Sequence, residues 1–154
     1  MISCTEFILA YSELFKYLDR KHGFKAVRDF WIGISDDFLT NLREYVRKEG
    51  IEGMRKYWTH TLTEERADHT MISEPDRFVI EMHRCPSVGL LRKATWMKRY
   101  KRYCEHCDIL YRRVVEDYGF NYDVSYIDDK RGVCRVEISK KRNVKHKTRR
   151  GGRP

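Results

Sequence analysis

The chain has 154 residues, of which 41% are hydrophobic and 36% are charged, and its formal net charge at pH 7 is +9. This length and composition suit one domain with a buried core and a strongly charged surface. The sequence has no apolar run long enough to span a membrane, and no basic segment precedes the first apolar residues as it does in a secretory signal. We therefore expect a cytoplasmic protein whose thiols stay reduced and which has no membrane partner.

The positive charge is concentrated at the C-terminus. From Lys140 onward the chain has eight Lys and Arg residues and no acidic residue, which leaves a net charge of +1 for residues 1–139. The segment 140–154 has almost no apolar residue to bury, so we expect it to be a disordered tail. Such a tail can attract nucleic acid or another anionic surface, and it can equally be a solvated terminus.

The first half of the chain has the periodicity of helices. Apolar residues recur at helical spacing up to His22, and a glycine follows as a helix-ending residue. The pattern predicts a second helix over 24–34 and a third that is capped by Ser35 and ends at Gly50. A fourth helix is predicted from Ile51 onward.

The second half begins and ends with alternating apolar and polar residues, which are typical of strands. The predicted elements are strands at 69–72, 78–85, 120–126 and 134–138, short helical turns with a basic face at 87–100, and a helix at 103–118. The last two strands form a hairpin, so the sheet is expected to be mainly antiparallel. The order of elements predicts one α+β domain over 1–139, in which a helical N-terminal half packs on one face of a small four-stranded sheet.

Two thiols and a carboxylate share one face of the predicted helix at 103–118. Cys104, Cys107, Asp108 and Tyr111 are spaced i, i+3, i+4 and i+7. Asp108 can orient a water molecule, a substrate ammonium, or a nearby His or Arg, and Tyr111 can donate its hydroxyl or serve as a core aromatic. His106 lies about 100° around the helix from Cys107, so we expect it to be exposed.

Two further cysteines lie on segments that can reach this face. Cys85 precedes Pro86, which ends a strand because proline fixes its own φ and lacks an N–H, and Cys134 lies in the last strand. His83 is two residues before Cys85, so it shares the strand face and can act as a general base at the rim of a pocket. Each cysteine alone suits a small buried residue, so a functional interpretation requires that they converge.

Two kinds of chemistry suit these groups. One thiolate can attack an electrophilic carbon beside a positioned acid or base. Alternatively, Cys85, Cys104, Cys107 and Cys134 can bind zinc or an iron–sulfur cluster. The chain has a single Cys-x-x-Cys pair, and a helix carries it, whereas closed zinc sites usually use two short knuckles. We therefore favour chemistry without a cofactor.

The order of these motifs resembles the L-2-amino-thiazoline-4-carboxylic acid hydrolase family. The motifs are the strand that ends in Cys85-Pro86, the helix that carries Cys104 and Asp108, and the turn and strand that lead to Cys134. The specific similarity spans about residues 78–138. Cys107 and the Asp-Asp-Lys-Arg-Gly turn before Cys134 depart from the family pattern.

The resemblance implies a small cytoplasmic α+β enzyme that opens a thiazoline ring by hydrolysis, and it points to Cys85, Cys104, Asp108 and Cys134 as the catalytic residues. A cyclic C=N carbon is electrophilic, so a thiolate or an activated water can add to it while a carboxylic acid protonates the nitrogen. We expect Cys104 or Cys85 to be the nucleophile and Asp108 the proton carrier. The expected substrate-binding residues are Cys107, Tyr111 and His83, and the candidate cations for an anionic substrate are Arg84, Arg92, Lys93 and Arg135.

The sequence thus favours a hydrolase that acts on a small substrate at a carbon–nitrogen bond other than a peptide bond. Two alternatives stay open. The thiols of the same face can bind a small ligand or a metal without turnover, and the basic tail can associate with nucleic acid. Because residues 1–139 are nearly neutral and have no evident stripe of basic and aromatic residues, we expect nucleic acid to be bound only through the tail.

Overall fold

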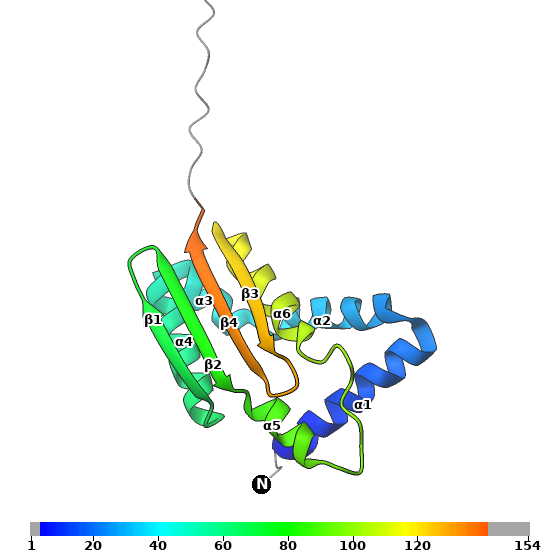
Figure 1. Ribbon diagram of the computed structural model, residues 1–154. Coiled ribbons are helices and arrows are strands. Elements are labelled where there is room, and N and C mark those ends of the chain that lie inside the picture. Colours follow the sequence, from blue (N-terminus) through cyan, green and yellow to red (C-terminus); the bar gives the residue numbers. More distant parts are fainter. Residues whose placement is uncertain (1–3, 142–154) are drawn as a thin grey trace, which may run out of the picture.

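A computed structural model describes residues 4–141 (Figure 1). The disordered tail expected over 140–154 begins too early, because Lys140 ends the last strand and pairs with Phe120. Residues 142–154 lie outside the described range. The helices and strands follow in the order α1 (Cys4–His22), α2 (Phe24–Phe38), α3 (Thr40–Glu49), α4 (Ile51–Glu64), β1 (Asp68–Ser73), β2 (Arg77–Arg84), α5 (Pro86–Lys93), α6 (Glu105–Asp117), β3 (Phe120–Asp128) and β4 (Val133–Lys140). None of the described helices is long and apolar enough to cross a membrane.

The strands form one antiparallel sheet in the order β1-β2-β4-β3. Helices α4 and α6 cover one face of this sheet, and α3 packs against them (Figure 1). The predicted α+β architecture is therefore confirmed. Strand register places residues of the covered face in rows, and the three rows across β2, β4 and β3 are Phe78–Ile138–Tyr122, Ile80–Val136–Val124 and Met82–Cys134–Tyr126.

Two hydrophobic cores stabilise the chain. The first lies between the sheet and α3, α4 and α6, and it includes Leu42, Met54, Phe78, Val114 and Ile138. The second joins α1, α2, α5 and the segment between α5 and α6, and it includes Phe15, Val27, Trp31, Leu91 and Tyr100. Helix α6 contributes to both cores, through Val114 to the first and through Ile109 to the second.

The predicted N-cap at Ser35 is wrong. Helix α2 continues to Phe38, and α3 begins at Thr40. Ser35 is fully buried, and its hydroxyl donates a 2.8 Å hydrogen bond to the carbonyl oxygen of Leu110 in α6. A serine side chain can satisfy its hydroxyl at a helix start or across a helix interface, so the sequence alone does not distinguish the two positions.

Helices α3 and α4 approach each other most closely at Gly53, where an added Cβ would lie 2.1 Å from the carbonyl oxygen of Tyr45. An added Cβ at Gly33 in α2 would meet nothing within 4 Å. We expect Gly53→Ala to lower the free energy of unfolding by roughly 2 kcal/mol or more, because the helices must separate. Gly33→Ala should raise it by up to about 1 kcal/mol. Urea denaturation measures both, and equal stability of the two variants would contradict this packing.

Candidate functional site

The first turns of α6 carry most of the predicted groups. Cys104 is the residue before the helix, but its backbone is already helical, with φ −69° and ψ −21°. Cys107, Asp108 and Tyr111 therefore follow it along one side, as the spacing predicted. Beside them, β4 brings Cys134 into the row with Met82 and Tyr126 on the covered sheet face.

The thiols of Cys85, Cys104, Cys107 and Cys134 lie close enough for neighbours among them to influence one another's pKa, and we call them the thiol cluster. Burial, followed by the neighbouring Cys107, Cys85 and Cys104 thiols, raises the pKa of Cys134 to about 12. Burial also raises the pKa of Cys107 to about 12, where Glu65 and Asp108 contribute next. All four thiols are free and half-buried. They are therefore protonated at neutral pH.

Cys85 is held at the junction of β2 and α5. Its backbone N–H donates to the carbonyl oxygen of Gly132 over 3.1 Å, and Pro86 begins the helix directly after it. Burial and then Cys107 raise the pKa of Cys85 to about 11, and the backbone N–H groups of Val88 and Ser87 oppose this rise. N–H groups at a helix start favour a thiolate, so Cys85 has the least raised pKa of the cluster.

Arg99 contacts the cluster from the segment between α5 and α6. Its Nη1 lies 3.7 Å from Cys104 Sγ and donates a 2.6 Å hydrogen bond to the carbonyl oxygen of Asp129. Burial raises the pKa of Cys104 to about 12, and Arg99 opposes that rise. The sequence analysis missed Arg99, because the contact depends on the β3–β4 turn reaching the start of α6.

His106 and Cys107 form a thiol–imidazole pair. His106 Nε2 lies 3.5 Å from Cys107 Sγ, and Nδ1 is hydrogen-bonded to the carbonyl oxygen of Tyr103. A carbonyl oxygen only accepts, so Nδ1 carries the proton and Nε2 presents its lone pair to the thiol. Burial lowers the pKa of His106, which keeps the ring neutral.

The expected exposure of His106 is wrong. Its ring is half-buried and packs against aromatic rings of the second core, with centroid distances of 6.0 Å to Phe15, 6.3 Å to Trp31 and 4.9 Å to Tyr103. Helix α6 is covered on two sides, so a residue that turns away from the sheet still meets protein. Helical periodicity locates one apolar face well, but it does not show that a second face is covered too.

Asp108 is ion-paired within α6. Its Oδ1 accepts hydrogen bonds from Arg112 Nε at 2.9 Å and Nη2 at 2.8 Å. Arg112 also bonds to Glu116 over 3.1 Å and to the carbonyl oxygen of Tyr122 in β3. The carboxylate thus joins α6 to the sheet through Arg112, so a proton-carrying role would require Asp108 to leave this pair.

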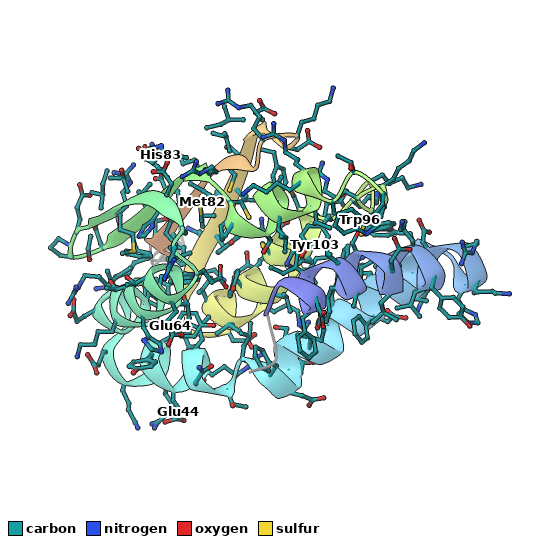
Figure 2. The ribbon with its side chains drawn as sticks, turned by 90° about the horizontal axis from the view of Figure 1, so that it is seen from below. Glu44, Glu64, Met82, His83, Trp96 and Tyr103 are labelled. Carbon is teal, nitrogen blue, oxygen red and sulfur yellow. The ribbon has the colours of Figure 1, made fainter. Side chains whose placement is uncertain are left out.

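The remaining predicted residues divide between the cluster and the surface. Tyr111 is half-buried near Cys107 and packs edge-on against Trp58 at 5.4 Å, and burial raises its pKa. His83 is exposed, and its Nε2 lies 2.9 Å from Thr70 Oγ1, so the structure does not bring it to the thiols. In Figure 2, His83 lies farther from the helices than its neighbour Met82.

The predicted cations also lie elsewhere. Arg135 pairs with Glu81, and with Glu137 at 3.3 Å, on the sheet face opposite to Cys134. Arg84, Arg92 and Lys93 are exposed. Side-chain alternation along a strand explains the first result, because Arg135 follows Cys134 directly and must point to the other face.

Glu65 is a further acidic neighbour of the cluster that the sequence analysis missed. It follows α4, where Arg66 adopts a left-handed conformation with φ 53° and Ala67 N–H donates to the carbonyl oxygen of Leu62 over 2.9 Å. Burial raises the pKa of Glu65, and His106 lowers it in part. This tight turn therefore places a carboxyl group near both members of the thiol–imidazole pair.

Within residues 4–141, no group of three or more His, Cys, Asp or Glu side chains is arranged to hold a metal ion. The zinc or iron–sulfur site considered from Cys85, Cys104, Cys107 and Cys134 therefore has no support in the geometry. The four thiols come from a strand end, a helix and another strand rather than from two knuckles, so nothing in the local chain conformation directs them to one point.

Comparison with protein-family models and with curated proteins gives no match for this chain. Arguments about its function therefore rest on the residues and their geometry.

The raised pKa values make the native thiols slow nucleophiles. We expect iodoacetamide to alkylate the thiol cluster at neutral pH at least about 100-fold more slowly in the native protein than in urea, because few thiolates are present. As the pH rises toward 11, Cys85 should react before Cys104, Cys107 and Cys134. Mass spectrometry of proteolytic peptides measures each rate, and a native thiol that reacts as fast as the unfolded one would contradict this.

Proposed function

We propose that this protein is a cysteine-dependent hydrolase that acts on a small cyclic C=N substrate of the thiazoline type, with Cys107 as the nucleophile and His106 as the general base. The thiol–imidazole contact of 3.5 Å carries the proposal. A nucleophile, a base within reach and a third group that orients the base are the usual features of nucleophilic catalysis, and the Tyr103 carbonyl oxygen supplies the third. The motif resemblance to the thiazoline-carboxylate hydrolases supports the substrate class. Cys107 departs from that family's pattern, so its role as the nucleophile rests on the contact with His106 alone.

The proposed first step is addition of the Cys107 thiol across the C=N bond. The S–H proton moves to His106 Nε2 while sulfur bonds to the ring carbon, and the C=N electron pair moves to nitrogen. The imidazolium then returns the proton to that nitrogen, so the pair is neutral before and after the step. A neutral pair suits a buried site, because no isolated thiolate has to be held there before the substrate arrives.

Ring opening and hydrolysis complete the proposed reaction. The lone pair of the protonated nitrogen re-forms the C=N bond as the bond between the attacked carbon and the second ring heteroatom breaks, and His106 carries the proton from that nitrogen to the leaving heteroatom. A water molecule, deprotonated by His106, then adds to the same carbon, and the Cys107 thiol leaves with a proton from the imidazolium. The sum is one water consumed and one ring opened, with the enzyme regenerated.

Arg99 is the cation proposed to bind a substrate carboxylate. Its guanidinium contacts Cys104 Sγ, and its side chain is 18% exposed, so a small anion can approach it from solvent. Asp129 is its present partner at 3.2 Å. A substrate carboxylate that displaces Asp129 from Arg99 keeps the charge-assisted hydrogen bonds of the guanidinium. Such an exchange suits reversible substrate binding.

Single substitutions test the assignment with 2-amino-thiazoline-4-carboxylate as the probe. We expect Cys107→Ser to lower kcat by about 1000-fold or more, and His106→Gln to lower it by roughly 100-fold or more, because nucleophile and base are removed. Arg99→Gln should mainly raise KM. Mass spectrometry of the ring-opened product provides the rates.

His60→Gln is the matched control, because His60 is an exposed histidine of α4 that pairs with Glu64 rather than with a thiol. It should retain full activity. Cys104→Ser, Cys85→Ser and Asp108→Asn separate the alternatives suggested by the sequence. Full turnover by Cys107→Ser would refute Cys107 as nucleophile, and saturable binding of the probe without turnover by the unaltered protein would favour a ligand-binding function.

A further inference from the structure

One side of the folded domain has a strongly basic surface. Between Glu81 and Glu105 the chain has seven Lys and Arg residues and no acidic residue. Residues 1–139 have a net charge of only +1, so this segment is far more positively charged than the rest of the domain. The structure places Lys98, Arg99 and Lys101 beside Lys16 and Arg20 of α1. We call this group the basic surface, together with the exposed Arg92, Lys93 and Trp96 of the same segment.

From this surface we infer that the folded domain binds single-stranded nucleic acid. The site does not depend on the hydrolase proposal, although Arg99 lies next to both sites, since it lines this surface while its guanidinium contacts Cys104. It also differs from the expectation that nucleic acid would be bound only through the tail. Cations of α1 and of the segment between α5 and α6 lie far apart in the sequence and meet here through folding, so the sequence alone did not reveal this basic surface.

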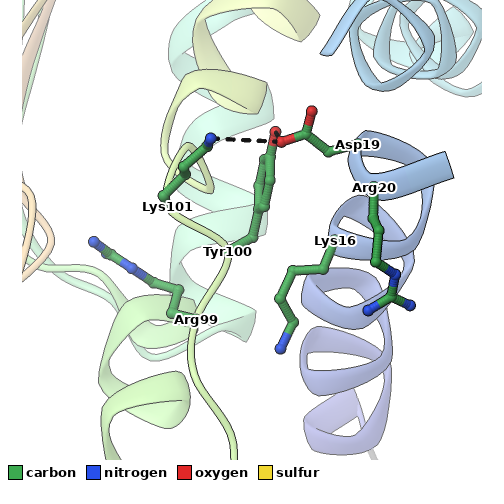
Figure 3. Close-up of a pocket in the computed structure, with 6 residues that line it drawn as sticks. All are labelled: Lys16, Asp19, Arg20, Arg99, Tyr100 and Lys101. Atoms are coloured by element: carbon green, nitrogen blue, oxygen red, sulfur yellow. Dashed lines mark hydrogen bonds and ion pairs between the residues drawn. The ribbon is translucent and has the colours of Figure 1, made fainter. Parts of the chain in front are cut away.

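A shallow hollow of about 380 Å³ lies between α1 and the segment that contains Tyr100. It is lined by Lys16, Asp19, Arg20, Arg99, Tyr100 and Lys101. Figure 3 shows Lys16 and Arg20 on α1 facing the segment with Tyr100 and Lys101, whereas the Arg99 guanidinium points away from them. Asp19 accepts a 3.1 Å hydrogen bond from the Tyr100 hydroxyl and lies 3.8 Å from Lys101, so the acid of this hollow is largely satisfied.

Several cations of the surface lack an acidic partner. Among residues 4–141, no ion pair within 4 Å involves Arg20, Arg92, Lys93 or Lys98, and all four are exposed. Elsewhere in the domain exposed cations are commonly paired, as Arg47 and Lys48 are with Glu44. Of the cations that line the hollow, Arg20 has no such pair, whereas Lys16, Arg99 and Lys101 pair with Glu13, Asp129 and Asp19. Unpaired cations attract phosphate groups and release counterions when phosphates bind.

Trp96 supplies an aromatic platform. Its side chain is 79% exposed and projects from the segment between α5 and α6 (Figure 2), whereas Trp31 and Trp58 are buried. The segment is anchored on α1, because Tyr100 N–H donates to Ser12 Oγ over 2.9 Å and Lys16 donates to the carbonyl oxygen of Lys98 over 2.9 Å. An exposed aromatic ring beside cations suits stacking by an unpaired base.

The residue types favour nucleic acid over a lipid surface. Lys16, Arg20 and Lys101 line a shallow hollow, where the phosphates of a flexible strand can contact several cations at once. Bases of a double helix are stacked on each other, so Trp96 can engage only an unpaired one. The combination therefore points to a single strand.

Fluorescence anisotropy with a labelled oligouridylate of about 12 nucleotides tests the inference on the full chain. Arg20→Gln/Lys101→Gln should weaken binding roughly 10-fold at 0.1 M salt and reduce the slope of log K against log salt by about 1.4, because two phosphate contacts are lost. The matched control is Lys25→Gln/Lys48→Gln, which removes two exposed cations from α2 and α3. It should change neither quantity appreciably. Equal affinities of the two double variants would overturn the proposal, since the tail would then account for binding.

Tryptophan fluorescence tests the stacking platform. The oligonucleotide should quench the emission of the unaltered chain, and Trp96→Leu should abolish the quenching and weaken binding about fivefold or more. Undiminished quenching in Trp96→Leu would overturn the role of Trp96. Binding to anionic phosphatidylserine vesicles is measured in parallel. Binding to the vesicles without binding to oligouridylate would contradict the proposal and show that the basic surface binds membranes. Turnover of the thiazoline probe should be unchanged in all these variants, so failure here leaves the hydrolase proposal separately testable.

Discussion

Burial of α6 between two hydrophobic cores is the constraint on which the site depends. One side of this helix packs on the sheet through Val114, and another packs on α2, where Ser35 bonds to the Leu110 carbonyl oxygen. With both sides fixed, Cys107 and His106 have little freedom to separate, although neighbours on a helix normally diverge. A helix exposed on one side would leave the imidazole in solvent and the thiol without a base.

The same burial determines the protonation of the site. Desolvation is the largest cause of the raised pKa in every thiol of the cluster, ahead of the influence of neighbouring groups. It also lowers the pKa of His106, so the two partners meet as neutral thiol and neutral imidazole. Such a site would resist oxidation and alkylation at rest, because both reactions require a thiolate, and would become nucleophilic only while a proton moves between the partners.

Charges are arranged differently on the two outer surfaces. On the exposed face of the sheet, Arg77 bonds to Glu137 over 2.8 Å, and Arg135 bonds to both Glu81 and Glu137. Two arginines and two glutamates thus neutralise each other there. On the basic surface beside α1, cations outnumber acids and surround a hollow. The first arrangement screens the sheet face electrostatically, whereas the second leaves a positive potential that can act on an anionic partner.

Periodicity in the sequence determined most of the fold, because alternation and helical spacing record which side chains face a core. The four strands, the last hairpin and the helical first half were all predicted. The spacing of Cys104, Cys107 and Asp108 likewise determined that they share a side of α6. Tertiary structure decided the rest. It buried Ser35 and His106, paired Asp108 with Arg112, and brought Arg99 to Cys104. Each of these contacts joins segments, or faces of a helix, whose meeting depends on the packing of the whole chain, and local sequence patterns do not encode that packing.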